Sequence, residues 1–281
     1  MSKVPRAAIT GWPVAHSRSP AIHGYWLKTH GLEGSYERVA VEPEKAAGFY
    51  NNFAQSGLIG CNVTVPHKEV AASACDWLDP AARAMGAANT LWLDQDGRLC
   101  GANTDGLGFV ANLDQGFPQW DKQKGSAVVL GAGGASRAIV WSLLDRGFEA
   151  VHIVNRTLEK AERLATEFGP KTSAHTFDKL ADLLGAACVL VNTTSLGMSG
   201  KDPLLIDLSP LSEGAFVTDI VYAPLETDLL RQARERGHPT VDGLGMLLHQ
   251  AVPGFEKWFG VRPVVDEVLR DLVVADLGLA S

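Results

Sequence analysis

Residues 128–137 read Val-Val-Leu-Gly-Ala-Gly-Gly-Ala-Ser-Arg, which predicts a strand, a glycine turn and a helix in succession. Val128–Leu130 has the apolar character of a short buried strand, and the helix is expected to begin near Ser136. A helix N-terminus presents free N–H groups and the positive end of its dipole, so this turn is typical of a pyrophosphate site. The strict pattern G-x-G-x-x-G is not met, because Ser136 occupies the third glycine position. A tight turn without a ligand is the alternative.

The next predicted strand, Val151–Val154, is followed by Asn155, Arg156 and Thr157. An NAD site usually carries Asp or Glu here to hold the ribose 2′-hydroxyl, whereas a cation suits a 2′-phosphate. Because the chain offers Arg156 and no acidic residue, the loop predicts an NADP site. Taken alone, an arginine at such a position is more often a solvated surface charge.

Composition narrows the class of protein. The 281 residues suffice for two modest domains, and 46% hydrophobic and 20% charged residues are an ordinary globular mix. The net charge of −7 and the lack of a basic run argue against a nucleic-acid partner. No segment reads as a signal peptide or is apolar enough to span a membrane, so we expect a cytoplasmic protein.

The cysteines and histidines suggest neither a disulfide framework nor a metal site. No C-x-x-C pair occurs, so the cysteines are expected to be reduced thiols. His16 and His23 are seven residues apart and lack a third ligand, and we predict no metal. The four cysteines are Cys61, Cys75, Cys100 and Cys188.

Strands and helices are expected to alternate in the first part of the chain, with a hairpin at Asp94–Gly97. The first sheet is therefore predicted to be mixed, with one antiparallel pair. The expected strands are Ala7–Thr10, Tyr36–Val41, Leu58–Val65, Ala88–Leu93 and Leu99–Asn103; the expected helices are Ala21–Thr29, Glu44–Gln55 and one from Pro66.

After a polar stretch, Gln115–Lys124, which we interpret as a surface loop between domains, the alternation resumes and predicts a parallel sheet. The chain closes with helices over Leu244–Phe259 and Pro263–Asp276. The predicted fold is α/β with two domains, a mixed α/β domain at 1–106 and a Rossmann domain at 107–240, while helices in 241–281 pack back on the first. The expected strands after the loop are Val128–Leu130, Val151–Val154, Ala174–Thr176, Cys188–Asn192 and Ala215–Asp219.

Two hydroxyls stand in the first loop, Gly11–Pro20, just before a helix. Ser19 followed by Pro20 fits a helix N-cap with proline at the first helical position. A helix N-terminus flanked by the hydroxyls of Ser17 and Ser19 also fits a substrate carboxylate. The sequence alone leaves both interpretations open.

A lysine and an aspartate are the candidate proton-transfer pair. If Pro66 opens a helix, Lys68 lies in its first turn, where an exposed cation opposes the helix dipole at a cost of ~0.3–1 kcal/mol. Local rules broken in this way often mark functional sites. Asp105 precedes a helical pattern and is either an N-cap or a carboxylate that holds the Lys68 ammonium. A solvated lysine is the alternative for Lys68.

These segments together resemble the shikimate dehydrogenase family over nearly the whole chain. The matching stretches, in order, are G-W-P-V-A-H-S-R-S-P, N-V-T-V-P-H-K, G-A-A-N-T-L, N-T-D-G, G-A-G-G-A-S-R-A, N-R-T, N-T-T-S-L-G-M, D-I-V-Y-A-P-L-E-T and G-L-G-M-L-L-H-Q-A. Gly24 departs from the family, which often has Asn there. The resemblance implies NADPH-dependent reduction of 3-dehydroshikimate to shikimate by a monomer or homodimer.

The resemblance also implies roles for individual residues. Lys68 and Asp105 would form the catalytic pair. The carboxylate of the substrate would be bound by Ser17 and Ser19. The remaining substrate residues would be Thr64, Asn89, Asp105, Tyr222 and Gln250, and those at the cofactor Gly131, Ala132, Gly133, Gly134, Ala135, Asn155, Arg156, Thr157, Thr193 and Gly243.

Three rival functions remain open at this point. A quinate/shikimate dehydrogenase with relaxed substrate or NAD use would not need Arg156. A folate-type dehydrogenase with the same two-domain plan would not need the double serine loop. A catalytically silent dinucleotide sensor would have no use for both Lys68 and Asp105.

Overall fold

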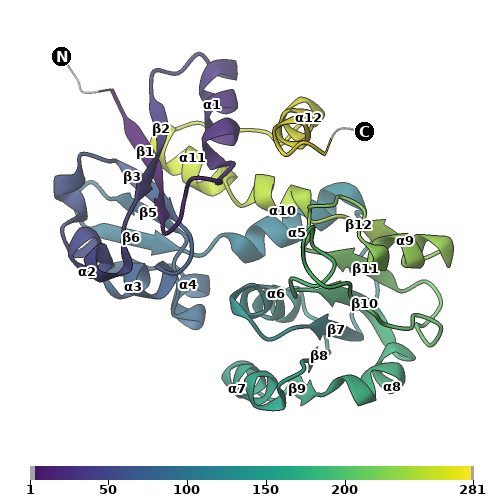
Figure 1. The fold of residues 1–281 in the computed structure, drawn as a ribbon. Coiled ribbons are helices and arrows are strands. Elements are labelled where there is room, and N and C mark those ends of the chain that lie inside the picture. The colour runs from purple at the N-terminus through teal and green to yellow at the C-terminus, as the bar shows by residue number, and fades with distance from the viewer. Residues whose placement is uncertain (1–3, 280–281) are drawn as a thin grey trace. The chain divides into compact units, whose positions relative to one another are not determined.

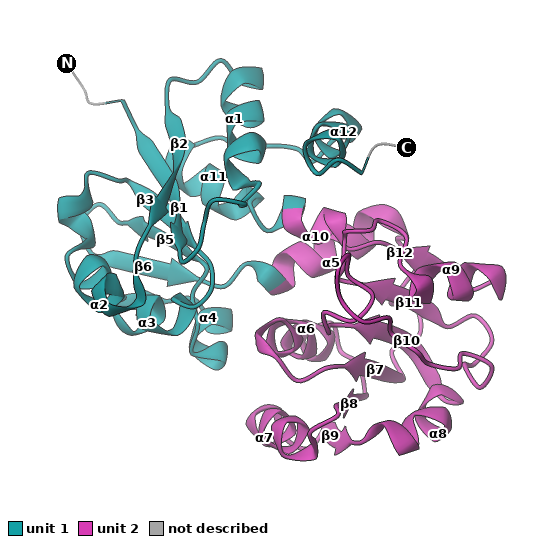
Figure 2. Cartoon of the chain, in the orientation of Figure 1, with its two compact units in different colours: residues 1–105, 248–280 teal, residues 106–247, 281 magenta. Residues whose placement is uncertain are grey.

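The computed structural model describes residues 4–279, which divide into two compact units (Figures 1 and 2). Unit 1 holds the described residues up to Asp105 and those from Leu248 onward, and unit 2 holds Gly106–Leu247. We expected the second boundary after residue 240. Instead, the chain stays in unit 2 past that point, because Thr240–Val241 forms strand β12 beside β11 (Phe216–Asp219).

Unit 1 is built on a six-stranded sheet in the order β2-β1-β3-β5-β6-β4. The expected hairpin joins β5 and β6 as an antiparallel pair. The expectation of a single antiparallel pair was wrong, since β3 and β5 also run antiparallel. That direction depends on the crossover between the strands, which no local pattern reveals. The strands are β1 (Arg6–Gly11), β2 (Ser35–Ala40), β3 (Gly60–Val63), β4 (Trp77–Leu78), β5 (Thr90–Leu93) and β6 (Leu99–Ala102).

Helices of unit 1 begin and end at local signals. Helix α3 starts at Lys68 rather than at Pro66, because the His67 N–H first closes a turn on the Thr64 carbonyl. Helix α12 starts at Glu267, where the Asp266 carboxylate accepts the N–H of Leu269, and not at Pro263. The helices are α1 (Ser19–Thr29), α2 (Pro43–Asn51), α3 (Lys68–Ser73), α4 (Pro80–Met85), α11 (Val252–Phe259) and α12 (Glu267–Asp276), with a short 3₁₀ turn at Phe53–Ser56.

The single helix expected over Leu244–Phe259 is two helices, α10 (Leu244–His249) and α11. Pro253 lacks an N–H, so an unbroken ladder through this point is impossible and the chain restarts with proline in the first turn. The break sets Gln250 in the turn between the helices. Helix α11 then packs on β3 and β5, and the indole N–H of Trp258 donates to the Leu91 carbonyl at 2.9 Å.

Unit 2 contains an all-parallel sheet in the order β12-β11-β10-β7-β8-β9, which confirms the predicted parallel arrangement. The strand order reverses between β7 and β10, the place where such sheets bind ligands beyond the carboxyl ends of their strands. The strands not yet given are β7 (Ser126–Leu130), β8 (Ala150–Val154), β9 (Thr172–His175) and β10 (Ala187–Asn192).

The stretch Gln115–Lys124 is not a surface loop between domains. Helix α5 continues to Gly116, and the residues after it lead into β7 within unit 2. Trp120 is 3% exposed and stacks on Phe148 at 5.9 Å between ring centroids, so an aromatic anchor holds this polar stretch to the core. The helices of unit 2 are α6 (Gly134–Asp145), α7 (Leu158–Phe168), α8 (Leu180–Leu184), α9 (Asp228–Glu235), α5 (Asp105–Gly116) except its first residue, and α10 except its last two residues.

Replacing Gly60 by alanine is expected to destabilise unit 1. A Cβ there would lie 2.0 Å from Nε1 of Trp258 and 2.4 Å from the carbonyl oxygen of Leu91. Overpacking of this kind costs about 1–3 kcal/mol of unfolding free energy, measurable by urea denaturation. Gly48→Ala is the matched control, since a Cβ at that helical position meets nothing within 4 Å. Equal stability of the two variants would contradict this packing.

Candidate active site

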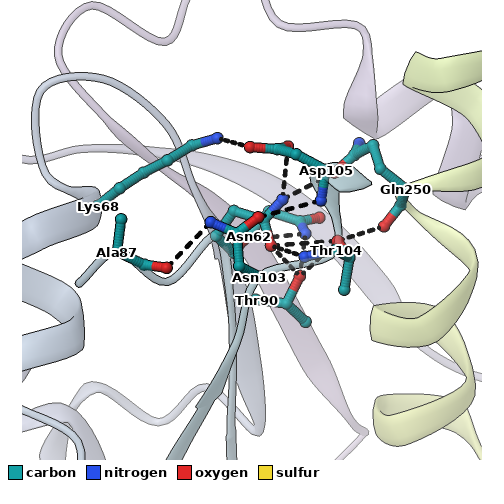
Figure 3. Close-up of polar contacts among 9 residues, drawn as sticks. Asn62, Lys68, Ala87, Thr90, Asn103, Thr104, Asp105 and Gln250 are labelled. Carbon is teal, nitrogen blue, oxygen red and sulfur yellow. Dashed lines mark hydrogen bonds and ion pairs between the residues drawn. The ribbon is translucent and has the colours of Figure 1, made fainter. Parts of the chain in front are cut away.

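Lys68 and Asp105 come together in unit 1, from the first residues of α3 and α5 (Figure 3). The Lys68 ammonium donates to Oδ2 of Asp105 at 2.5 Å, and the two side chains are 28% and 18% exposed. An ion pair that is mostly shielded from water keeps its charges in a fixed geometry. The carboxylate of Asp105 is therefore committed to Lys68 and not to capping its own helix.

The second oxygen of the Asp105 carboxylate has a different partner. Nδ2 of Asn89 donates to Oδ1 of Asp105 at 2.7 Å and lies 3.5 Å from Oε1 of Gln250. The hydroxyl of Thr104 donates to the Gln250 backbone carbonyl at 2.8 Å, which fixes the turn before α11 to the start of α5. The structure thus brings together four expected site residues: Lys68, Asn89, Asp105 and Gln250.

His67 anchors the chain directly before Lys68. The imidazole of His67 is 1% exposed, and its Nε2 lies 2.7 Å from the Val41 carbonyl oxygen. This contact fixes the residue before α3 to the segment after β2. The next side chain, Lys68, therefore leaves the helix from an anchored position and reaches Asp105.

The first loop places Ser17 and Ser19 side by side. The Ser17 hydroxyl lies 3.2 Å from the Ser19 hydroxyl and accepts the Ser19 N–H at 3.3 Å. The N-cap interpretation of Ser19 is wrong: Ser19 is already the first helical residue, the cap position is Arg18, and no side chain caps the helix. The Arg38 guanidinium donates to the Ser17 carbonyl at 2.7 Å and holds the loop from β2.

Thr64 follows β3, on the loop that leads to Lys68. Its N–H donates to the Thr10 carbonyl at 2.9 Å, and its methyl group covers Gly11. A Cβ on Gly11 would lie 2.5 Å from Cγ2 of Thr64, so glycine is required where the two loops meet. The Thr64 side chain is half-buried.

In unit 2 the glycine loop has the shape that the sequence predicts. Gly131 has φ +110, and a Cβ there would lie 2.7 Å from the Thr193 hydroxyl, whereas a Cβ on Gly133 or Gly134 would meet nothing within 4 Å. The loop is therefore closely packed at Gly131, on the side of Thr193, whereas there is free space beside Gly133 and Gly134. Helix α6 begins at Gly134, and the N–H groups of its first turn lack intrahelical acceptors.

Ser136 replaces the third glycine and has a function of its own in the loop. Its buried hydroxyl accepts the Gly133 N–H at 2.9 Å and lies 2.7 Å from the hydroxyl of Thr193. Thr193 in turn donates to the Leu130 carbonyl at 2.6 Å. Thr193, directly after β10, therefore holds the glycine loop that joins β7 to α6.

The other expected cofactor residues differ in exposure. Arg156 is exposed and has no ion-pair partner among residues 4–279, which leaves its charge available. Asn155 Nδ2 donates to the Thr157 carbonyl at 2.8 Å and closes the turn around Arg156. Gly243 is buried, and a Cβ there would lie 2.4 Å from the Ile220 carbonyl oxygen.

Tyr222 lies in unit 2, half-buried in the segment after β11. Ala132 and Ala135 lie within the glycine loop and the first turn of α6. Within the described part of the chain, no group of three or more histidine, cysteine, aspartate or glutamate side chains is arranged to hold a metal ion.

Sequence reasoning missed the polar residues behind the pair. Asn62, 3% exposed, donates from Nδ2 to Oγ1 of Thr90 at 3.2 Å and accepts the phenol of Tyr36 on Oδ1 at 2.6 Å. The available signal was a lone amide inside the apolar strand Gly60–Val63. Its partners come from other strands, and pairing between strands does not follow from local pattern.

Three family models match the chain. Residues 9–91 match the shikimate dehydrogenase substrate binding domain, residues 114–199 the shikimate / quinate 5-dehydrogenase model, and residues 243–270 the shikimate 5'-dehydrogenase C-terminal domain. A shikimate dehydrogenase (NADP(+)) of Azorhizobium caulinodans is 58% identical over 97% of this chain and 96% of its own length.

Solved structures agree with this relationship. A shikimate 5-dehydrogenase from Thermus thermophilus, in complex with NADP(H) and shikimate, has a TM-score of 0.83 and 36% identity, covering 98% of this chain and all of its own. A quinate dehydrogenase from Corynebacterium glutamicum in complex with NAD has a TM-score of 0.88 and 28% identity, covering 97% and 99%. The order of the motifs, the two α/β units and these relatives lead to one conclusion: the chain belongs to the shikimate dehydrogenase family.

Proposed function

We propose that this protein catalyses the reversible NADPH-dependent reduction of 3-dehydroshikimate to shikimate, a step of aromatic amino-acid biosynthesis, in the cytoplasm. The observation that carries the proposal is the ion pair of Lys68 and Asp105, 2.5 Å apart and braced by Asn89. High identity to NADP(+)-dependent shikimate dehydrogenases supports the substrate and the cofactor. The free thiols of all four cysteines fit a reducing compartment.

Lys68 is the proposed proton donor. When bound, NADPH supplies the hydride that reduces the substrate carbonyl carbon. As the carbonyl becomes an alcohol, negative charge develops on its oxygen, and the Lys68 ammonium stabilises that charge and gives up a proton to it. Asp105 holds the ammonium in place from one oxygen while the other oxygen accepts from Asn89. In the reverse direction Lys68 takes the proton back.

The substrate is a polar anion, so its site must supply hydrogen bonds. The neighbouring hydroxyls of Ser17 and Ser19 are the proposed ligands of the carboxylate. Thr64, Asn89, Asp105 and Gln250 are proposed to bind the ring oxygens. The side-chain amide of Gln250 lies beside that of Asn89, which supports this assignment.

Unit 2 is the proposed cofactor domain, and its residues fit a dinucleotide phosphate. The glycine loop has free space beside Gly133 and Gly134, and the α6 N-terminus offers N–H groups to the pyrophosphate. The free cation of Arg156 suits the 2′-phosphate. We expect a monomer or homodimer without nucleic-acid or membrane partners; among residues 4–279, every helix is too short or too polar to cross a bilayer.

An absorbance assay of the reduced cofactor tests the proposed function directly. Shikimate and quinate are each offered with NADP and with NAD, and we expect shikimate with NADP to give the highest kcat/KM. Preference for quinate or NAD would favour the relaxed quinate/shikimate enzyme. Cofactor binding without turnover of either substrate would favour a sensor.

Lys68→Ala is expected to lower kcat by about 10²–10⁴-fold, the usual contribution of a positioned acid or base, while KM for shikimate changes little. Steady-state kinetics with purified protein measures both constants. Lys45→Ala is the matched control, since Lys45 lies in the same unit but pairs with Glu42 on an exposed helix turn. A large rise in KM with kcat retained would make Lys68 a binding residue instead.

Arg156→Ala is expected to weaken NADP binding by about 10–100-fold, the loss of one charge-assisted hydrogen bond of ~1.5–3 kcal/mol. NAD binding should stay close to wild type, because NAD lacks the 2′-phosphate. Titration calorimetry with each cofactor measures the difference, and Arg163→Ala, an exposed arginine on α7, is the control. An equal loss for both cofactors would reject the proposed contact.

A further inference from the structure

Behind the catalytic pair runs an unbroken chain of hydrogen bonds that the reaction as described leaves unused. Oδ2 of Asp105 receives Lys68, and Oδ1 receives Nδ2 of Asn89. Oδ1 of Asn89 accepts the Thr90 hydroxyl at 3.0 Å. The next two links extend this chain to Asn62 and Tyr36: Thr90 accepts from Asn62 at 3.2 Å, and Asn62 accepts the Tyr36 phenol at 2.6 Å.

Backbone groups fix the direction of every amide in this chain. Nδ2 of Asn62 also faces the carbonyl oxygen of Asn89 at 3.3 Å, which can only accept, so the other amide atom must be the oxygen. Oδ1 of Asn89 accepts the Thr104 N–H at 2.9 Å, which can only donate. Each link therefore donates toward Asp105, and bonds aligned in one direction polarise one another.

Tyr36, on β2, is the start of the chain. Its phenol can only donate to Oδ1 of Asn62, and burial raises the pKa of Tyr36 well above its ordinary value, so the donor proton is retained. The ring stacks on His23, with 4.0 Å between centroids and 10° between planes. Burial lowers the pKa of His23 to about 3, so the stacked imidazole is neutral. The Ser19 hydroxyl is a second polar neighbour of the phenol.

We propose that Tyr36 is a positioning residue for the reaction: its phenol anchors the donor chain Tyr36–Asn62–Thr90–Asn89 that orients the Asp105 carboxylate toward Lys68. The proposal rests on the proposed function. Tyr36 touches neither Lys68 nor Asp105 and acts only through the amides between them. Removing its hydroxyl leaves Oδ1 of Asn62 without its donor and loosens every link that follows.

The first test compares two phenols of unit 1, half-buried Tyr36 and buried Tyr50. Tyr36→Phe is expected to lower kcat for shikimate roughly 5–20-fold with KM within about twofold of wild type, since the change acts on positioning and not on binding. Tyr50→Phe is the matched control: its hydroxyl lies 2.8 Å from that of Thr10, which donates to the backbone carbonyl of Asn62 and not to its side-chain amide, so kcat should be unchanged. Thermal denaturation of both variants separates lost activity from lost fold.

A double-mutant cycle tests whether the effect travels along the chain. Thr90→Val removes a middle link while keeping the shape of the side chain. The double variant Tyr36→Phe/Thr90→Val should lose much less kcat than the product of the two single losses, because both substitutions break the same chain. Tyr50→Phe combined with Thr90→Val should instead give the product of its single losses.

Three results would overturn the proposal. Equal kcat for Tyr36→Phe and Tyr50→Phe would leave Tyr36 no role in the reaction. A rise in KM with kcat unchanged would mean that Tyr36 acts in substrate binding, through Ser19 and the substrate carboxylate, and not in positioning Asp105. A kcat loss in the double variant Tyr36→Phe/Thr90→Val equal to the product of the two single losses would show that the two residues act independently and not through one chain. Each requires active wild-type protein; wild-type protein inactive with shikimate and NADP would refute the proposed function itself.

Discussion

The site depends on a carboxylate that receives a donor on each of its two oxygens. Asp105 takes the Lys68 ammonium on one side and the Asn89 amide on the other, so neither its position nor that of Lys68 is free to drift. A partly shielded ion pair is favourable only when its remaining lone pairs are also satisfied. The first sheet supports Asn89, the second partner of Asp105, because Asn62 on β3 is paired with Thr90 on β5 and Asn89 directly precedes β5.

The same arrangement explains why the chain returns to unit 1 near its end. The turn between α10 and α11 offers the Gln250 carbonyl to Thr104 and the Gln250 side chain to Asn89. Trp258 then anchors α11 on Leu91, next to Gly60, where no larger residue fits. Packing of the last helices thus completes a polar site formed mainly by the first hundred residues.

Local signals in the sequence were enough for part of this structure. The alternation of strands and helices after the Gln115–Lys124 stretch predicted the parallel sheet, and the glycine turn after Val128–Leu130 predicted a helix near Ser136, two residues after the start of α6. The unfavourable place of a cation near a helix start singled out Lys68, and its expected partner Asp105 lies beside it. The two-residue strands β4 and β12, the reversed direction of β5 and the role of Asn62 were missed. All of these depend on pairing between distant segments, for which no periodicity in one segment is a guide.

Lys68, held by Asp105, is proposed to face the reacting oxygen of the substrate, and a crystal structure of the complex with shikimate would show its position. The hydroxyl oxygen formed by reduction is expected within hydrogen-bond reach of the Lys68 ammonium, about 2.6–3.2 Å, with Asp105 still in contact with Lys68. Shikimate bound with that hydroxyl turned away from both side chains would exclude Lys68 as the proton donor.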